Sequence, residues 1–406
     1  MKRVFITGIG VVSPIGIGRI EFWKNLIGGK CGTADLENVD TSLFKNHRGG
    51  EVKNLDPYPF VSPTEVASLQ RGALMAVMAA RMALDDAAIH LDKENLDRVG
   101  VALGTTMGEI QALEKANQIR FKKGPEHRYP ELLAAYAPVQ IAGAVSKALG
   151  IRGPSTIIPN ACAAGNFALV NSFELIRQGK ADYMLAGGVD PFSLNAFTGF
   201  NRLGAVSHDV VRPFDKDSKG MMVSEGAGVV VMEAAESVEK RNAVIYAELI
   251  GYGLTCDANH MTAPHPDGIR RAMMQALKMA NLQPAAIDAV IAHGTGTPAN
   301  DHAEIGGLKS VFGQRKNQVP VTSIKSMLGH SMGAASAIEA ITNALMVQND
   351  IIPPTIHFTS PHSEIDPNIL IVGNQCMHKR VCCGMNNALA FGGNNSSLIM
   401  KKFVRG

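Results

Sequence analysis

The chain has 406 residues, of which 46% are hydrophobic and 18% charged, a balance that suits a large buried interior in two domains or two fused halves. The net charge is only +3 and no block of Lys and Arg stands out, which argues against nucleic-acid binding. No apolar run reaches the roughly 20 residues that a membrane-spanning helix needs, which argues against a membrane protein.

The N-terminus, Met1–Lys2–Arg3, leads directly into an apolar run without a signal peptide, so we expect a cytoplasmic protein with reduced cysteines. We expect no metal site, because no zinc spacing is present among the six cysteines, Cys31, Cys162, Cys256, Cys376, Cys382 and Cys383. Val4–Thr7 predicts a strand, and Gly8–Ser13 after it is similar to the start of a dinucleotide-binding fingerprint. Ser13 stands where a third glycine is needed, which disfavours a nicotinamide or flavin cofactor.

The next segments alternate between loop, helix and strand. Residues 28–62 are rich in glycine and proline and predict a loop, whereas Glu65–Ile89 predicts one long, largely buried helix. Val99–Thr106 predicts a strand and a turn. Residues 107–135 are more charged and less periodic, and we expect them to form a surface excursion over a pocket that Met107 lines. The alternative is that Met107 is an ordinary core methionine.

Cys162 lies between a β-branched run and an amphipathic segment. Ser155–Ile158 predicts a buried strand, and the apolar residues after Cys162 recur at helical spacing as far as Gly179, which is typical of a helix C-terminus. Cys162 is therefore expected at a helix N-terminus, where unpaired N–H groups and the macrodipole lower the pKa of a thiol and make it nucleophilic. The alternative is that Cys162 is a small buried hydrophobic residue.

The pattern of the first half restarts near residue 245. Strand-like and helix-like segments follow one another in the order Ile245–Ile250, Asp267–Met279, Ile287–Ala292, Val319–Thr322 and Ser331–Val347. This order mirrors the first half and predicts an α/β protein built from two related halves, with sheets buried on both faces. We place the halves at residues 1–250, with the candidate nucleophile, and 251–406, with the candidate histidines.

Three reactive side chains, Cys162, His293 and His330, follow predicted strand ends, where α/β proteins place their sites. A lone histidine there is more often structural. Together, however, a thiolate and two imidazoles suffice for carbon–carbon bond formation from thioesters. The thiolate holds the acyl group, and neutral imidazoles stabilise the oxyanion of a decarboxylating nucleophile. Lys325, shortly before His330, is expected either to hold local charge and loop geometry or to face solvent.

The segment Ala390–Ser396 is a glycine-rich turn between two apolar runs. Phe391 on such a turn can act as a gate, and its backbone N–H can point at an oxyanion. The alternative is an ordinary hairpin turn.

Taken together, these residues resemble the β-ketoacyl-acyl-carrier-protein synthases, the elongating condensing enzymes of the thiolase-like superfamily. The resemblance covers nearly the whole chain. It is carried by six motifs in order, Thr7–Gly16, Asn160–Gly165, Arg212–Asp215, Gly226–Gly228, His293–Pro298 and Lys325–His330.

The resemblance implies a five-layered αβαβα thiolase fold, an acyltransferase activity and no redox cofactor. The reaction implied is the decarboxylative Claisen condensation of an enzyme-bound acyl thioester with malonyl-acyl-carrier-protein, in fatty-acid or polyketide elongation. Substrates would arrive on the phosphopantetheine arm of an acyl carrier protein. The family is usually homodimeric, and a heterodimer with a related subunit is the alternative assembly.

The family's residue roles fall on matching positions of this chain. A Cys-His-His triad is typical of elongating members, so His330 favours elongation. The resemblance implies that Cys162 carries the acyl group and that His293 and His330 promote malonyl decarboxylation. It implies that Lys325, paired with Glu339, keeps the site organised. Thr295 and Thr297 would form hydrogen bonds with phosphopantetheine, and the backbone N–H groups of Cys162 and Phe391 would form the oxyanion hole.

The chain departs from the family pattern in two places. Leu389 replaces an aromatic residue, and Ala390 replaces a glycine that gives the gate its freedom. The segment Val206–Val211 is shorter than in a housekeeping fatty-acid enzyme. Both departures leave the chemistry intact and keep a specialised polyketide or polyene pathway open.

Three other protein classes fit the sequence less well. A non-catalytic chain-length partner subunit lacks the nucleophile, which Cys162 supplies here. A degradative thiolase uses a second cysteine, and the surroundings of Cys382 and Cys383 do not match that motif. A cysteine hydrolase needs a water-activating pair of histidine and acid, which the sequence does not display.

Overall fold

The structure is a computed structural model that describes residues 2–404. Its first half contains strands and helices that build a sheet with two covered faces, together with shorter peripheral elements. In chain order the elements are β1 (Val4–Ser13), β2 (Gly16–Ile17), α1 (Arg19–Ile27), β3 (Ala34–Asp35), β4 (Arg48–Gly49), α2 (Pro63–Ser68), α3 (Arg71–Asp86), β5 (Val99–Gly104), α4 (Ile110–Lys123), α5 (Pro130–Tyr136), α6 (Val139–Leu149), β6 (Ser155–Ile158), α7 (Ala164–Arg177), β7 (Tyr183–Asp190), α8 (Leu194–Arg202), β8 (Gly226–Ala234) and α9 (Ala235–Arg241).

The second half repeats the alternation of strands and helices. Its elements are β9 (Ala247–Cys256), α10 (Pro266–Ala280), β10 (Ala289–Ile291), α11 (Pro298–Phe312), β11 (Val319–Thr322), α12 (Lys325–Leu328), α13 (Gly333–Asn349), β12 (Ile351–Ile352), β13 (Ile369–Ile371), β14 (Met377–His378), β15 (Cys383–Ala390) and β16 (Asn394–Lys401).

The main strands form one 12-stranded sheet in the order β13-β11-β10-β15-β16-β9-β1-β8-β7-β5-β6, with β2 attached to β1. Starting from the centre, β1-β8-β7-β5-β6 in the first half matches β9-β16-β15-β10-β11 in the second. The pairings match as well, because the first two in each half are antiparallel and the next two are parallel. The two halves are therefore related, as the sequence predicted.

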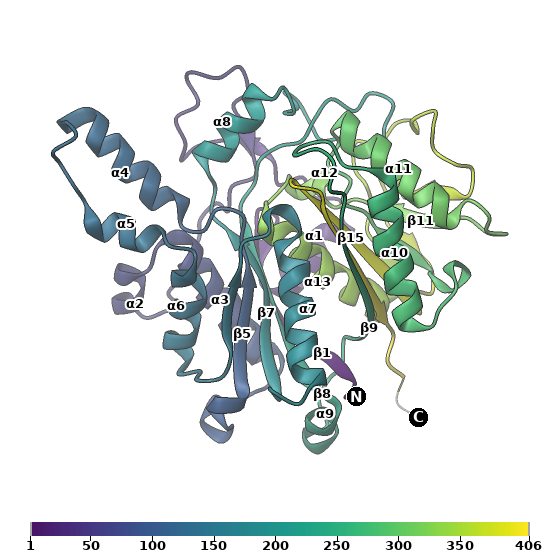
Figure 1. The fold of residues 1–406 in the computed structure, drawn as a ribbon, viewed down its shortest axis with the longest axis horizontal. Helices are drawn as coiled ribbons and strands as arrows, with labels where there is room; N and C mark the ends of the chain where they lie inside the picture. Colours follow the sequence, from purple (N-terminus) through teal and green to yellow (C-terminus); the bar gives the residue numbers. More distant parts are fainter. Residues whose placement is uncertain (1, 405–406) are drawn as a thin grey trace.

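Five layers of alternating helices and strands make up the molecule (Figure 1). Helices α3 and α6 cover the outer face of the first half-sheet, and α10 and α11 cover that of the second. Helices α7 and α13 lie between the half-sheets, and α13 packs against β7 and β8 on one side and β15 on the other. The predicted α/β class and αβαβα layering are confirmed.

Glycines inside strands allow this close packing. The sequence predicted that the first strand ends before Gly8, but β1 continues through the glycine motif to Ser13. A Cβ atom at Gly8 or Gly10 would overlap the backbone carbonyl oxygen of Ala83 or Ala79 on α3. These glycines therefore serve helix–strand contact rather than a cofactor.

Two local predictions were wrong, and a third needs a narrower statement. The expected helix over 65–89 is two helices, because α2 starts at Pro63 under a capping box from Ser62 and ends before α3 begins at Arg71. Strand β6 is present but is not buried, because it lies at the edge of the sheet. Residues 107–135 do form a surface excursion, the helices α4 and α5, which project from the body (Figure 1). Gln111, Glu114, Lys115 and Gln118 of this excursion line a separate pocket, and not the cavity that holds Cys162.

The predicted division at 250/251 stays a prediction, and strand β9 spans that position. Within residues 2–404, no single helix is long and apolar enough to cross a bilayer. Only α5 and α6 taken together have the length and apolar composition of a membrane span, and this pair is bent.

Candidate active site

Cys162 sits in a sharp turn between β6 and α7. Ala161 has a φ of 45°, a backbone conformation that a residue with a side chain rarely adopts, and it starts a single 3₁₀ turn that runs into α7. Gly104 at the end of β5 approaches the backbone of Ala164 so closely that a Cβ atom has no room. The turn is held by packing and places the thiol just before the helix, as predicted.

The predicted lowering of the thiol pKa is not what the structure gives. Cys162 is 6% exposed, and burial raises the pKa of its thiol to about 12, with Lys325 opposing the shift and Asp190 reinforcing it. Desolvation of the charged form outweighs the favourable position at the helix N-terminus. The resting nucleophile is therefore a thiol, and its proton must leave as the thioester arrives.

His293 follows β10 and is fixed through its backbone. The N–H groups of His293 and Gly294 donate to the two carboxylate oxygens of Glu304, at 2.8 and 2.7 Å. Glu304 lies on α11, and burial raises the pKa of its carboxyl to about 7. The helix that follows the histidine thus holds the turn that carries it.

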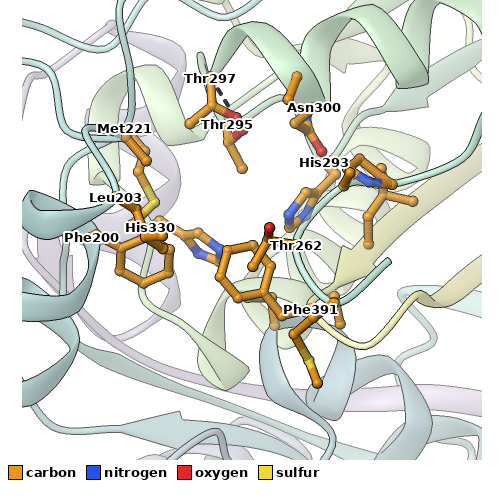
Figure 2. A pocket seen from close by; sticks show the side chains of 18 of the residues that line it. Phe200, Leu203, Met221, Thr262, His293, Thr295, Thr297, Asn300, His330 and Phe391 are labelled. Carbon is orange, nitrogen blue, oxygen red and sulfur yellow. Dashed lines mark hydrogen bonds between the residues drawn. The ribbon is translucent and has the colours of Figure 1, made fainter. Parts of the chain in front are cut away.

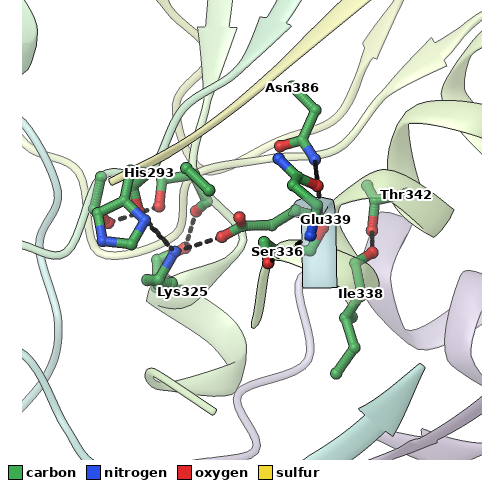
Figure 3. Close-up of polar contacts among 12 residues, drawn as sticks. His293, Lys325, Ser336, Ile338, Glu339, Thr342 and Asn386 are labelled. Atoms are coloured by element: carbon green, nitrogen blue, oxygen red, sulfur yellow. Dashed lines mark hydrogen bonds and ion pairs between the residues drawn. The ribbon is translucent and has the colours of Figure 1, made fainter. Parts of the chain in front are cut away.

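Lys325 is buried, 1% exposed, and lies between His293 and Glu339 (Figure 3). Its Nζ is 3.2 Å from Nδ1 of His293 and donates to the backbone oxygen of His293 at 2.7 Å and to the carboxylate of Glu339. An ammonium group has only donors, so Nδ1 of His293 accepts and the ring proton resides on Nε2. Burial raises the pKa of Glu339 to about 7 against the pull of Lys325. The solvent-facing alternative for Lys325 is excluded.

His330 lies between α12 and α13 and is also held by its backbone. Its N–H donates to the oxygen of Met222 at 2.7 Å, and its own oxygen accepts from the N–H of Ser224 at 2.9 Å. The rings of His293 and His330 meet edge to face with centroids 5.3 Å apart. Burial, followed by the charge of Lys325, holds the pKa of both imidazoles well below the usual value, so both are neutral near pH 7.

A cavity of about 210 Å³ joins these groups (Figure 2). It is lined by Cys162, Phe200, Leu203, Ala205, Met221, His260, Met261, Thr262, Ala263, Pro264, His293, Thr295, Thr297, Ala299, Asn300, His330, Leu389, Ala390, Phe391 and Gly393. The structure therefore gathers Cys162, His293, His330 and Phe391 around one space, with Lys325 and Glu339 behind the histidines.

Thr295 and Thr297 face this cavity from the loop before α11. Their hydroxyl oxygens lie 2.9 Å apart, and the N–H of Thr297 donates to the Thr295 hydroxyl at 3.3 Å. The loop passes through Gly294 and Gly296, which have φ values of 40° and 75°. A hydroxyl pair on such a loop can bind the amides of an extended ligand.

Phe391 lies in the turn that joins β15 to β16. It is 38% exposed, and its ring centroid is 5.5 Å from that of Phe200 on α8. The left-handed φ values of this turn fall on Gly392 and Gly393, and the N–H of Gly392 donates to the oxygen of Met261 at 2.8 Å. The turn is a hairpin, as the alternative had it, and it also forms part of the cavity wall.

Met107 is not among the residues that line this cavity, and its role in substrate binding stays a prediction. Its side chain is partly buried against a hydrophobic cluster that includes Phe197, Met221 and Met332. Asp190 holds its backbone, since the N–H of Met107 donates to that carboxylate at 3.1 Å. The strand end was located correctly, and the cluster that Met107 contacts includes Met221, which itself lines the cavity.

Sequence reasoning missed the segment after β9. In this segment, Nδ1 of His260 accepts hydrogen bonds from the backbone N–H groups of Thr262 and Ala263, both at 3.2 Å. All three residues line the cavity. The pairing of β9 with β16 brings the loop after β9 beside the Phe391 turn, and local sequence patterns carry no signal of this long-range pairing. Within residues 2–404, no group of three or more His, Cys, Asp or Glu side chains is placed to hold a metal ion.

Comparison with known proteins decides the family. Residues 1–237 match the family model "Beta-ketoacyl synthase, N-terminal domain", and residues 246–359 match "Beta-ketoacyl synthase, C-terminal domain". The chain belongs to the β-ketoacyl synthase family. It is 37% identical over 410 residues to the 3-oxoacyl-[acyl-carrier-protein] synthase 2 of Staphylococcus aureus (strain COL), with 99% of both chains covered.

Solved structures agree with this assignment. The ishigamide ketosynthase/chain length factor is similar with a TM-score of 0.95 and 37% identity, covering 99% of this chain and all of that one. AntDE:AntF, a type II ketosynthase in complex with its acyl-carrier protein, is similar with a TM-score of 0.90 and 31% identity over 99% of this chain and all of that one. The predicted family, fold and acyltransferase class are confirmed, and neither the partner-subunit nor the thiolase alternative is favoured.

Proposed function

We propose that this β-ketoacyl synthase condenses an acyl group held on Cys162 with malonyl-acyl-carrier-protein, releasing carbon dioxide and a β-ketoacyl-acyl-carrier-protein. One observation carries the proposal: Cys162 and the two neutral imidazoles of His293 and His330 line a single cavity. Elongating chemistry needs this combination of one nucleophile and two neutral donors.

In the first half-reaction, the sulfur of Cys162 attacks the carbonyl carbon of an acyl thioester, and the carrier's phosphopantetheine sulfur leaves with the proton that the thiol gave up. The tetrahedral oxyanion is stabilised by backbone N–H groups, for which we propose those of Cys162 and Phe391. Because burial raises the pKa of Cys162 to about 12, thiol deprotonation and attack occur together.

In the second half-reaction, the malonyl carboxylate leaves as carbon dioxide and its bonding pair forms an enolate. The Nε2–H of His293, fixed by Lys325 at Nδ1, and the ring of His330 stabilise the enolate oxygen. The enolate carbon then attacks the acyl carbonyl, and the Cys162 sulfur leaves as the new carbon–carbon bond forms. Neutral imidazoles suit this step, since a protonated ring would quench the carbanion.

The substrates are delivered by an acyl carrier protein, and no redox cofactor takes part. The Thr295 and Thr297 hydroxyls hold the phosphopantetheine arm in the loop that borders the cavity. Arg202 at the end of α8 lies between Phe200 and Leu203, both of which line the cavity, and offers a positive charge to an acidic carrier. We place the enzyme in the cytoplasm, where its six free cysteines remain reduced.

The enzyme works as a dimer, either with its own copy or with a related subunit. The edge strand β6 supports this proposal, because Ser155 is exposed and Thr156, Ile157 and Ile158 are only half-buried in the single chain. Fatty-acid and polyketide elongation use the same condensation chemistry. The identity of the acyl group that the enzyme accepts therefore distinguishes the two pathways.

Mass spectrometry of the acyl group on Cys162, after incubation with a panel of acyl carrier proteins, tests the proposal. We expect an acyl adduct on Cys162 and, with malonyl-carrier protein, an elongated product. Cys162→Ala abolishes both, whereas His293→Ala and His330→Ala lose carbon dioxide release and retain acyl loading. Elongation by Cys162→Ala, or carbon dioxide release at the wild-type rate in both histidine variants, contradicts the assignment.

A further inference from the structure

Asp190, the last residue of β7, is a buried carboxylate with no cationic partner in the described part of the chain. It is 2% exposed and accepts four hydrogen bonds, all from uncharged donors. A buried anion without a counter-ion is costly to fold around. Its donors show what it holds in place.

The donors come from two segments that are far apart in the sequence. Oδ1 accepts from Thr105 Oγ1 at 2.7 Å and from the N–H of Met107 at 3.1 Å. Oδ2 accepts from the N–H of Thr106 at 2.8 Å and from the N–H of Gly333 at 2.6 Å. Asp190 therefore joins the turn after β5 to the first residue of α13.

The bond to Gly333 acts on the segment that carries His330. Met332, between them, has a φ of 50°, which a side chain tolerates only where surrounding contacts hold it. A Cβ atom at Gly333 would lie 2.8 Å from Asp190 Oδ2 and from the Thr105 backbone, so α13 begins tight against this carboxylate. The positive end of the α13 macrodipole faces the anion and stabilises it.

We infer that Asp190 is a positioning residue for malonyl decarboxylation, because its carboxylate fixes the segment from His330 to Gly333 against the Thr105–Met107 turn. This inference rests on the proposed function. Its donors do not include the turn that carries Cys162. Its hydrogen bonds therefore act on the half-reaction that uses His330, whereas its charge raises the pKa of the Cys162 thiol and so hinders acyl loading.

Asp190→Asn tests the role of the charge in nearly the same volume. One of the two oxygens becomes an NH₂ group, which faces either the N–H groups of Thr106 and Gly333 or the N–H of Met107. In either orientation the NH₂ group of the new asparagine faces a backbone N–H group, and two donors cannot form a hydrogen bond. The matched control is Glu109→Gln, because Glu109 is also buried and accepts the N–H groups of Gly72 and Ala73 at the start of α3, and not the N–H of Gly333.

The experiment measures carbon dioxide release from malonyl-acyl-carrier-protein and single-turnover acylation of Cys162 in folded wild-type and variant enzymes. For Asp190→Asn we expect kcat for decarboxylation to fall about tenfold to a hundredfold, as displaced catalytic groups do. KM for the malonyl carrier stays within about twofold of the wild type, and acyl loading does not fall, because removal of the Asp190 charge lowers the pKa of the Cys162 thiol. Glu109→Gln keeps both half-reactions. If Asp190→Asn does not fold, Thr105→Val, which removes one donor to Asp190 and the acceptor of the Gly108 N–H, undergoes the same comparison.

Equal losses in both half-reactions, or full decarboxylation by folded Asp190→Asn, overturn the inference. The wild-type assays separate this from a failure of the proposed function. If the wild type performs neither half-reaction, the proposed function is wrong and the inference falls with it. If the wild type performs both and the variant keeps their ratio, only the role of Asp190 is wrong.

Discussion

Lys325 and Glu339 form a buried ion pair in which each charge stabilises the other. Lys325→Met leaves the Glu339 carboxylate buried without its cation, so we expect a loss of about 3–5 kcal/mol in the free energy of unfolding by urea. The double variant Lys325→Met/Glu339→Gln regains most of that stability, because no isolated charge remains. It does not regain condensation, because Nδ1 of His293 still lacks its donor.

An exposed pair of the same residue types supplies the control. Lys53 pairs with Glu37 on the surface, so Lys53→Met leaves the free energy of unfolding essentially unchanged. Equal stability of wild type and Lys325→Met contradicts the account of the buried pair. Recovery of full activity in the double variant contradicts the role of Lys325 in orienting His293.

The pKa of Cys162 predicts how its reaction with iodoacetamide depends on pH. Because burial raises this pKa to about 12, the thiolate fraction and the alkylation rate rise about tenfold per pH unit between about pH 7 and 9. Cys31 is an internal control. Burial opposes its ionisation, but hydrogen bonds with His357 and Thr33 outweigh burial and lower its pKa to about 7, so its rate levels off over the same range.

Site-resolved mass spectrometry of alkylated peptides measures both rates in one sample. A plateau for Cys162 below about pH 8 shows that the helix N-terminus overrides burial and that the thiolate is preformed.

At the residue scale, sequence patterns located the reactive groups but not their environments. Strand ends and helix starts follow from local periodicity, so Cys162, His293 and His330 could be found. The pKa of Cys162 depends on atoms from many segments, and the sequence argument considered only its own helix. Met107 shows the same limit, because its backbone contact with Asp190 and its side-chain contact with the cluster around Met332 come from distant segments.

At the element scale, contact between β1 and α3 depends on the absence of side chains. Gly10→Ala forces a methyl group into the carbonyl oxygen of Ala79, and we expect a loss of about 1–3 kcal/mol in the free energy of unfolding. Gly143→Ala in α6 is the matched control, because no atom lies within 4 Å of its added Cβ. That substitution stabilises the protein by about 0.5–1 kcal/mol through helix propensity. Equal effects of both substitutions in urea unfolding contradict the packing argument.

The Phe391 turn gives a second test at this scale. Ala390 ends β15 opposite Asn394 and has no left-handed φ, so its methyl group does not strain the observed conformation. It does restrict other conformations of the turn. Ala390→Gly is therefore expected to speed acyl exchange, most for long chains. Unchanged exchange rates across chain lengths, measured by mass spectrometry of Cys162, count against a stiffened gate.

Helices and strands were predictable where the apolar periodicity is strong. They were not predictable where a break within a helix or a position at the edge of the sheet determines the structure. The helices of the two halves follow apolar spacing, and the repeated order of elements predicted a repeated fold. The interruption between α2 and α3 arises from separate caps, which the apolar pattern conceals. Strand β6 has the composition of a buried strand but ends the sheet, and no local pattern distinguishes these two positions.

At the scale of the whole molecule, β6 predicts how two chains meet. Val101 donates to the oxygen of Pro154 and Thr105 to that of Ile158, which fixes the phase of the parallel pairing and leaves the N–H of Ser155 pointing away from β5. Ser155→Pro removes this outward donor without breaking the sheet. If β6 pairs with a second chain, light scattering gives wild-type particles of twice 43.2 kDa and Ser155→Pro particles near 43.2 kDa. Ser146→Ala, which removes only the hydroxyl bonded to Ser155, stays dimeric. A dimeric Ser155→Pro variant with wild-type dissociation behaviour shows that the subunits join elsewhere.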